Sequence, residues 1–241
     1  MENPYESRRL LDEYLLFHYG DPADVLPWKN GPIESLGFPV RTVTAFHDYS
    51  VRGRALDLGC AVGRSAFELS RFCQEVVAVD YSHSFIEAAK RLQTEGSLYY
   101  SCREEGARSR ILSAKLPWGC HPERVRFEQG DAMNLRADLG DFDLVHAANL
   151  LCRLSEPAML LQRLPRLMRP GGMLILTTPC TWLEEYTPPA NWPPGSTLDW
   201  LRGALSVGFD LVKQTDIPFL IREHARKFQW SVALGTCWRR K

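Results

Sequence analysis

The ten residues 55–64 constrain the fold of this chain more than any other segment. A short apolar run leads through Asp57 to two glycines, Gly59 and Gly63, and a helix-like stretch follows. This pattern is typical of a buried strand that ends in a tight turn, where glycine lets the backbone approach a ligand. The next apolar run ends in Asp80, 23 positions after Asp57. That separation is about one βαβ unit, at which a carboxylate can accept hydrogen bonds from a ribose, so the sequence predicts a nucleoside-containing cofactor.

The order of small residues in this turn narrows the choice of cofactor. Dinucleotide-binding folds use G-x-G-x-x-G, in which an early second glycine lets the backbone approach a pyrophosphate. Here the order is Asp57-x-Gly59-x-Ala61-x-Gly63, with the acidic residue two positions before the first glycine. A carboxylate at that place repels phosphate and favours a cofactor that carries positive charge.

This turn resembles the first motif of class I S-adenosylmethionine (SAM) methyltransferases, D/E-x-G-x-G-x-G, with Ala61 in place of the middle glycine. Later segments follow the order of motifs in the same family. Segment 124–132 ends near Asp131, where the family places a carboxylate beside the adenine, and Asn149 ends a run that resembles the fourth strand. A helix, a Pro-Gly-Gly stop and an apolar strand then follow within 156–178. An ordinary strand-turn-helix and a nicotinamide oxidoreductase stay as alternatives to this interpretation.

The resemblance implies an α/β fold with a seven-stranded, mostly parallel, Rossmann-like sheet, helices on both faces and an N-terminal helical cover. The last strand is expected to be antiparallel and to lie within Phe228–Trp238. We expect a single methyltransferase domain over residues 1–241. Its parts are the N-terminal cover (1–50), the SAM-binding core (51–180), and the substrate loop with the C-terminal strands (181–241). Segment 97–123 is too long for an ordinary loop of a compact domain, so we predict a partly structured insertion there.

Composition agrees with one α/β core. The 241 residues carry 29 basic and 29 acidic side chains, so no excess charge indicates a nucleic-acid or membrane partner. No apolar stretch approaches the roughly 18 residues of a membrane span, and the first residues lack the apolar region of a secretory signal. The seven cysteines are scattered without a C-x-x-C pair. The sequence therefore indicates a cytoplasmic protein with free thiols and no metal site.

Segments at both ends of the chain resemble a narrower family, the methyltransferase of ovothiol biosynthesis. The matching segments are Tyr14–Gly20, Phe38–Arg41, 57–65, 148–150, Thr181–Pro188 and Arg222–Val232. The resemblance implies methylation of the imidazole π nitrogen of 5-thiohistidine, which gives ovothiol A and S-adenosylhomocysteine (SAH). In the bifunctional enzyme of that family this domain follows an iron-dependent sulfoxide synthase. We therefore expect a stand-alone enzyme or an excised domain that acts with a separate or fused sulfoxide synthase.

Cofactor residues are predicted from the core motifs and from the segment that precedes the first strand. They are Arg41, Asp57, Gly59, Gly63, Asp80, Tyr81, Asp131 and Ala132. In this set Asp80 would hold the ribose, Asp131 would lie near the adenine, and Arg41 would pair with the methionyl carboxylate.

The substrate is expected to bind through elements added to the core, because the core motifs serve SAM in any class I methyltransferase. An amino-acid zwitterion needs an acidic and a basic partner, since buried charges go unpaired only at high cost. The predicted substrate residues are Tyr19, Glu184, Glu185, Tyr186, Arg226 and Lys227, and Asn149 is predicted to act beside the reacting methyl group. A sulfonium needs little acid–base help, so catalysis mainly holds the nitrogen in line. His146, inside an apolar strand, is predicted to be a satisfied core residue.

Two other functions remain open from the sequence. A protein of this fold can methylate another small nitrogen or sulfur nucleophile. The chain can also be a non-catalytic SAM-binding subunit of a sulfoxide synthase, although the complete set of cofactor residues argues against that.

Overall fold

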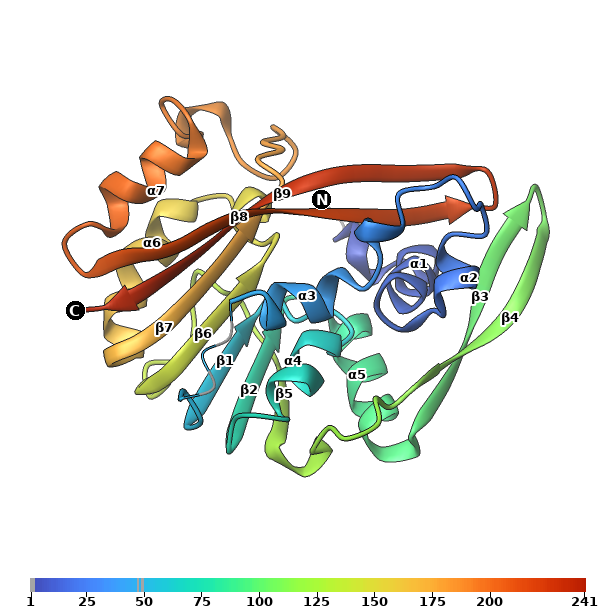
Figure 1. Cartoon of the computed structure of the whole chain (residues 1–241), viewed down its shortest axis with the longest axis horizontal. Coiled ribbons are helices and arrows are strands. Elements are labelled where there is room, and N and C mark those ends of the chain that lie inside the picture. Colours follow the sequence, from blue (N-terminus) through green and yellow to red (C-terminus); the bar gives the residue numbers. More distant parts are fainter. Residues whose placement is uncertain (1–2, 47, 49) are drawn as a thin grey trace.

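A seven-stranded sheet forms the centre of the protein (Figure 1), which the computed structural model describes at residues 3–46, 48 and 50–241. The strand order is β5-β2-β1-β6-β7-β9-β8. The strands are β1 (Arg54–Leu58), β2 (Glu75–Asp80), β5 (Val125–Gln129), β6 (Phe142–Ala148), β7 (Met168–Thr178), β8 (Phe209–His224) and β9 (Lys227–Arg240). Only β9 runs against its neighbours β7 and β8, and it extends slightly beyond the predicted Phe228–Trp238 at both ends. The predicted mostly parallel sheet with an antiparallel last strand is confirmed.

Helices cover both faces of this sheet. Alternate residues of β2 enter different clusters of the core, Val76 and Ala78 on one face and Val77 and Val79 on the other. This alternation explains why the interior of β2 is a continuous apolar run, since both of its faces are buried. One face packs against α3 (Phe38–Thr44), α4 (Arg64–Leu69) and α5 (His83–Glu95), and the other against α6 (Pro157–Leu167) and α7 (Thr197–Leu205).

The ends of the helices follow local sequence signals. Pro157 stands in the first turn of α6, where its missing N–H costs nothing. The N-terminus of α5 is capped by Ser82, whose hydroxyl accepts a hydrogen bond from the Phe85 N–H at 3.2 Å. Ser84 begins a Ser-x-x-Glu run that would fit a capping box, but it lies inside the helix, which already begins at His83.

The N-terminal cover consists of several short elements. They are η1 (Pro4–Glu6), α1 (Arg8–Tyr19), α2 (Pro22–Val25) and η2 (Ile33–Ser35), followed by α3. Ser7 separates η1 from α1 and caps α1 through the Leu10 N–H. Figure 1 shows α1 and α2 between the far half of the β8–β9 hairpin and a smaller hairpin.

That smaller hairpin occupies the predicted insertion at 97–123. Strands β3 (Ser97–Glu105) and β4 (Arg108–Lys115) pair with each other as a separate antiparallel sheet, and η3 (Pro122–Arg124) follows. Two further 3-10 turns are η4 (Leu151–Arg153) and η5 (Pro189–Asn191). Of the helices in the described part of the chain, none has the length and apolar character needed to cross a lipid bilayer.

Candidate active site

A cavity of about 830 Å³ lies at the carboxyl ends of β1, β2, β5 and β6, beneath the N-terminal cover. This edge is where open α/β sheets bind ligands, and the volume is within the usual range of small-molecule sites. The floor of the cavity consists of residues that end these strands or follow them within three positions: Gly59, Ala61, Asp80, Tyr81, Asp131, Ala132 and Asn149. The cover of the cavity consists of lining residues from η1, α1, α3, η4, the loop after β7 and β8, among them Tyr5, Tyr14, His18, Arg153, Glu185, Tyr186 and Phe219.

The turn after β1 has a backbone that requires small residues. Gly59 and Gly63 adopt left-handed conformations with φ of 69° and 87°, and Ala61 also has a positive φ of 47°. A Cβ atom on Gly63 would lie 2.7 Å from the ring of Phe127, so no larger residue fits. Gly63 itself is the N-cap of α4 and is not among the described residues that line the cavity. Its part in the site is therefore to shape the turn.

Asp80 ties this turn to the end of β2. Its carboxylate accepts hydrogen bonds from the N–H groups of Ala61 at 2.8 Å and Ser82 at 2.9 Å. Burial raises the pKa of Asp80 to about 6, the two N–H bonds oppose that rise, and the charge of Asp57 adds to it. Asp80 faces the cavity with an acceptor whose position the backbone fixes.

Asp57 lies under the floor and does not line the cavity, which corrects its prediction as a cofactor contact. Its two oxygens meet the Ser65 hydroxyl at 2.7 Å and His146 Nδ1 at 2.7 Å, and His146 Nε2 meets the Thr42 hydroxyl at 3.0 Å. This buried chain joins β1, β6 and α3. Ser65 lines the cavity, so Asp57 acts on the site through Ser65. The prediction that His146 is a satisfied core residue is confirmed.

Asn149 and Asp131 complete the floor. Asn149 follows β6 with a positive φ of 53°, a conformation that asparagine tolerates better than most residues. Its N–H donates to the Thr177 carbonyl at 2.8 Å, and its side-chain oxygen accepts from the Thr177 hydroxyl at 3.1 Å. Asp131 accepts from the Met133 N–H at 2.8 Å, which fixes its carboxylate at the end of β5.

The cover contributes a cation and a neutral histidine. Arg153 places its guanidinium over the ring of Tyr186, 4.6 Å from the ring centroid, and donates to the Thr181 carbonyl at 3.3 Å. Among the lining residues that the structure describes, Arg153 is the one arginine or lysine. His18 Nδ1 is buried without a hydrogen-bond partner in the described part of the chain. Burial, aided by the charge of Arg64, lowers the pKa of His18 to about 3, so its ring stays neutral.

Comparison with known proteins identifies the family to which this chain belongs. A family profile described as "Methyltransferase domain" matches residues 56–176, which span half of the chain and every floor residue. The chain belongs to the methyltransferase domain family. Its fold is that of a class I methyltransferase domain, and SAM is its cofactor.

Curated relatives of the methyltransferase are distant. The "O-methyltransferase cnsE" of Penicillium expansum is 26% identical over 184 residues, which cover 72% of this chain and 58% of that protein. The "Ubiquinone biosynthesis O-methyltransferase" of Xanthomonas oryzae pv. oryzae is 25% identical over 52% of this chain and 42% of its own length. The chain thus spans less than two thirds of these relatives.

Solved structures agree with the fold. The N-methyltransferase NodS of Bradyrhizobium japonicum superposes with a TM-score of 0.54 at 14% identity, over 84% of this chain and 92% of that one. A putative SAM-dependent methyltransferase of Listeria monocytogenes gives a TM-score of 0.55 at 12% identity, over 84% and 98%. At these identities the similarity shows the class I methyltransferase fold and not the substrate.

The floor of the methyltransferase cavity fits SAM in shape and charge. Its turn leaves no room for side chains, its carboxylates come from Asp80 and Asp131, and none of its members carries a positive charge. Asp80 would hold the ribose hydroxyls, and Asp131 with Ala132 would lie along the adenine. Tyr81 is largely exposed and lines the cavity beside Asp80.

Two predicted ligand residues of the N-terminal segment, Arg41 and Tyr19, do not line the cavity in the described structure. Arg41 donates from Nε to the Leu36 carbonyl at 2.8 Å and from the guanidinium end to the Pro218 carbonyl, so it joins α3 to β8 and does not reach the floor. The Tyr19 hydroxyl donates to the Val62 carbonyl at 2.7 Å. Tyr19 therefore supports the turn after β1 from behind.

The predicted substrate residues divide into two groups. Glu184 and Glu185 are both exposed, and of the two only Glu185 lines the cavity, together with the partly buried Tyr186. Arg226 lies over the ring of Trp28 at 5.1 Å, and Lys227 pairs with Glu223 at 2.8 Å. Both basic residues sit at the turn of the β8–β9 hairpin, away from the lining residues, because the two strands continue well beyond their pairing with β7.

Sequence reasoning missed Arg153. The residue follows Asn149 by four positions and lies at the same carboxyl edge of the sheet, which is the signal that would have found it. Tyr14 and His18 are spaced on α1 as ordinary packing residues, and nothing local distinguishes them as lining residues. In the described part of the chain, no group of three or more His, Cys, Asp and Glu side chains is arranged to hold a metal ion.

Proposed function

We propose that this methyltransferase methylates the imidazole π nitrogen of 5-thiohistidine, giving ovothiol A. The observation that carries the proposal is that the cover presents one cation, Arg153, and one acid, Glu185, to the same cavity. Arg153 matches the carboxylate of a free amino acid, and Glu185 matches its ammonium group. The resemblance of both chain ends to the ovothiol methyltransferase supports the same substrate. Arg153 takes the role that the sequence assigns to Arg226 and Lys227.

The neutral His18 favours a nitrogen nucleophile. SAM, when bound, supplies a methyl group on a sulfonium, and an imidazole nitrogen can accept it through its own lone pair without prior loss of a proton. An oxygen nucleophile such as a phenol needs a base, and with its pKa lowered to about 3 His18 is a poor one. The relatives named as O-methyltransferases therefore do not decide the acceptor atom for this chain.

His18 also offers a means to select the ring nitrogen. His18 lines the cavity with a neutral ring, and the unprotonated nitrogen of such a ring can accept a hydrogen bond from the τ N–H of the substrate ring. That bond would fix the tautomer in which the π nitrogen carries the lone pair. Arg153 and Glu185 would then hold the amino-acid end, and the aromatic residues Tyr14 and Tyr186 would exclude water around the ring. We further propose that a sulfoxide synthase, separate or fused, supplies the thiohistidine.

One assay tests the substrate and the alternatives together. The protein is incubated with SAM and, in parallel, with 5-thiohistidine, histidine, cysteine or catechol, and products are followed by mass spectrometry with NMR to locate the methyl group. The proposal requires methyl transfer to the π nitrogen of 5-thiohistidine in clear preference to the others. Methyl transfer to histidine, cysteine or catechol in preference to 5-thiohistidine would show that the proposed substrate is wrong. SAH binding without any transfer would favour the non-catalytic subunit.

A further inference from the structure

The 3-10 turn η1 contributes Pro4 and Tyr5 to the cover of the active-site cavity. Pro4 and Glu6 are exposed and Tyr5 is half-buried, so η1 adds little to the packed core. Ser7, whose backbone is extended, separates η1 from α1. The position of η1 over the cavity therefore depends on a small number of contacts, which come from Glu6 and Tyr5.

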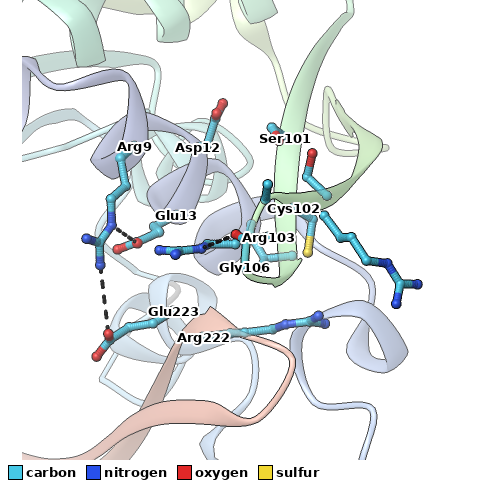
Figure 2. Close-up of a pocket in the computed structure, with 13 residues that line it drawn as sticks. Arg9, Asp12, Glu13, Ser101, Cys102, Arg103, Gly106, Arg222 and Glu223 are labelled. Atoms are coloured by element: carbon cyan, nitrogen blue, oxygen red, sulfur yellow. Dashed lines mark hydrogen bonds and ion pairs between the residues drawn. The ribbon is translucent and has the colours of Figure 1, made fainter.

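The helix α1, which follows η1, is held much more firmly. Leu15 and Leu16 are buried in the core. On the other side of the helix, Arg9 pairs with Glu13 at 2.8 Å and approaches Glu223 of β8 at 3.8 Å (Figure 2). The N-terminal cover thus has a fixed part, α1, and a part whose displacement would leave the core intact, η1.

Glu6 binds the N-terminus of α5. Its Oε1 accepts a hydrogen bond from the His83 N–H at 2.8 Å, and its Oε2 accepts from the Ser84 N–H at 3.0 Å and the Ser84 hydroxyl at 2.7 Å. The first N–H groups of a helix have no partner within it, and the helix dipole favours a negative charge at this end. Burial raises the pKa of Glu6, but the hydrogen bonds from Ser84 and His83 outweigh it and hold the pKa below its usual value. Glu6 therefore binds α5 as a carboxylate.

Tyr5 connects η1 with both parts of the active site. Its carbonyl accepts a hydrogen bond from the Ser82 hydroxyl at 3.1 Å, and the Ser82 N–H donates to Asp80, to which we assign the ribose. The ring of Tyr5 packs against Phe85 with the centroids 5.8 Å apart, and it lies 6.4 Å from the ring of Tyr186. Tyr5 therefore lies between the cofactor floor and the part of the cover that we assign to the substrate.

We propose that Glu6 is a positioning residue for methyl transfer, which holds η1 closed over bound SAM through its hydrogen bonds to the first turn of α5. In this closed arrangement Tyr5 covers the ribose end of the cofactor and helps to exclude water from the reacting methyl group. Release of Glu6 from α5 opens the cavity, so that SAM can enter and SAH can leave. The inference depends on the cofactor and not on the identity of the methylated substrate.

The rate at which SAH leaves the protein tests this role, and surface plasmon resonance on immobilised protein measures it. Glu6→Ala removes all three hydrogen bonds to α5, so dissociation of SAH should become about 10-fold faster. Glu6→Gln keeps one acceptor oxygen and should give a smaller increase. Glu87→Ala, which removes an exposed acid of the same helix, is the matched control. A rate for Glu6→Ala within about 3-fold of the wild-type rate overturns the proposal.

A double variant separates this positioning role from a purely structural one. If Glu6 acts by placing Tyr5, then Tyr5→Leu should also speed the release of SAH, and Glu6→Ala should add little once Tyr5 is replaced. A loss of helix capping alone would lower the urea-unfolding midpoint and leave the rate of SAH release unchanged, which would overturn the proposal. Effects of the two substitutions on the rate that multiply as independent factors would also overturn it.

Discussion

The floor and the cover of the active-site cavity hold their polar groups in different ways. In the floor, backbone N–H groups of Ala61 and Ser82 fix the Asp80 carboxylate, and Thr177 fixes Asn149. In the cover, Arg153 lies over the Tyr186 ring and donates to the carbonyls of Cys152 and Thr181, and His18 Nδ1 has no partner among the described residues.

This difference separates two tasks of the protein. A floor that is already satisfied by its own backbone presents the same acceptors before and after a ligand arrives, which suits a cofactor that is common to the family. The cover takes Arg153, Glu185 and His18 from three separate elements added around the core, which suits recognition of a selective substrate. The following predictions test that separation, beginning with the largest expected effect.

The support beneath the floor should give the largest effect on stability. His146 is fully buried between Asp57 and Thr42, so His146→Leu leaves one oxygen of the buried Asp57 carboxylate without its partner. We expect a loss of about 3–5 kcal/mol in the free energy of unfolding, measured with urea. His83→Leu, at an exposed position, is the control. A loss below about 1 kcal/mol for His146→Leu would show that the floor does not depend on this chain of hydrogen bonds.

Removing the negative charge of Asp80 should weaken cofactor binding. Asp80→Asn keeps the shape of the side chain and removes a charged acceptor, so SAH affinity should fall by about 2–3 kcal/mol, roughly 30- to 150-fold. Calorimetric titration with SAH measures the change, and Asp216→Asn on the exposed side of β8 is the matched control. Wild-type affinity in Asp80→Asn would refute the assignment of the ribose to Asp80.

Removal of the cover cation should act on the substrate and not on the cofactor. Arg153→Met keeps much of the packing against Tyr186 and removes the charge, so kcat/KM for 5-thiohistidine should fall by about 2 kcal/mol, roughly 30-fold. SAH affinity should stay near that of the wild type. If SAH affinity falls instead, Arg153 holds the cofactor and the division between floor and cover is wrong for this residue.

The pKa of Asp80 predicts a pH dependence of the floor. Because burial raises this pKa from 3.8 to about 6, the carboxylate is ionised at pH 7 and mostly protonated at pH 5. SAH affinity should therefore fall about 10-fold from pH 7 to pH 5. For folding the sign is opposite: the raised pKa contributes stability below the unfolded value, and this contribution is lost as the pH rises through about 6. SAH affinity in Asp80→Asn should show little of this pH dependence.

The smallest effect is expected at the hairpin turn. Arg226→Ala and Lys227→Ala remove exposed charges that contact Trp28 and Glu223, so kcat/KM should change by no more than about 0.5 kcal/mol. Steady-state kinetics beside Arg153→Met makes the comparison direct. A large loss in Arg226→Ala would mean that the hairpin turn reaches the substrate and that the cover extends further than the cavity indicates.

Local sequence was enough to predict the sheet and most of the floor. Asp80 ends its strand, Asn149 and Asp131 follow theirs by one and two positions, and parallel strands bring their carboxyl ends to one edge. Asp57 is the instructive exception in the same motif. Its place in the sequence matches a cofactor contact, but its side chain turns inward to Ser65 and His146, a choice that depends on residues 8 and 89 positions away.

What the sequence by itself determined is therefore the fold, the cofactor and the floor, because these depend on strand periodicity and on short turns whose geometry glycine and aspartate dictate. Only the tertiary structure decided the cover. The pairing of β9 with β7 ends at Leu234, and Arg226 precedes Leu234 by eight residues. At about 3.3 Å per residue, the hairpin turn therefore stands roughly 26 Å from the end of that pairing. Arg153, in contrast, reaches the cavity from a turn at the sheet edge, and His18 reaches it because α1 packs over that edge. The length of each element and the place where it packs decide which charged side chain lies at the cavity. The order of residues in the sequence does not give these positions.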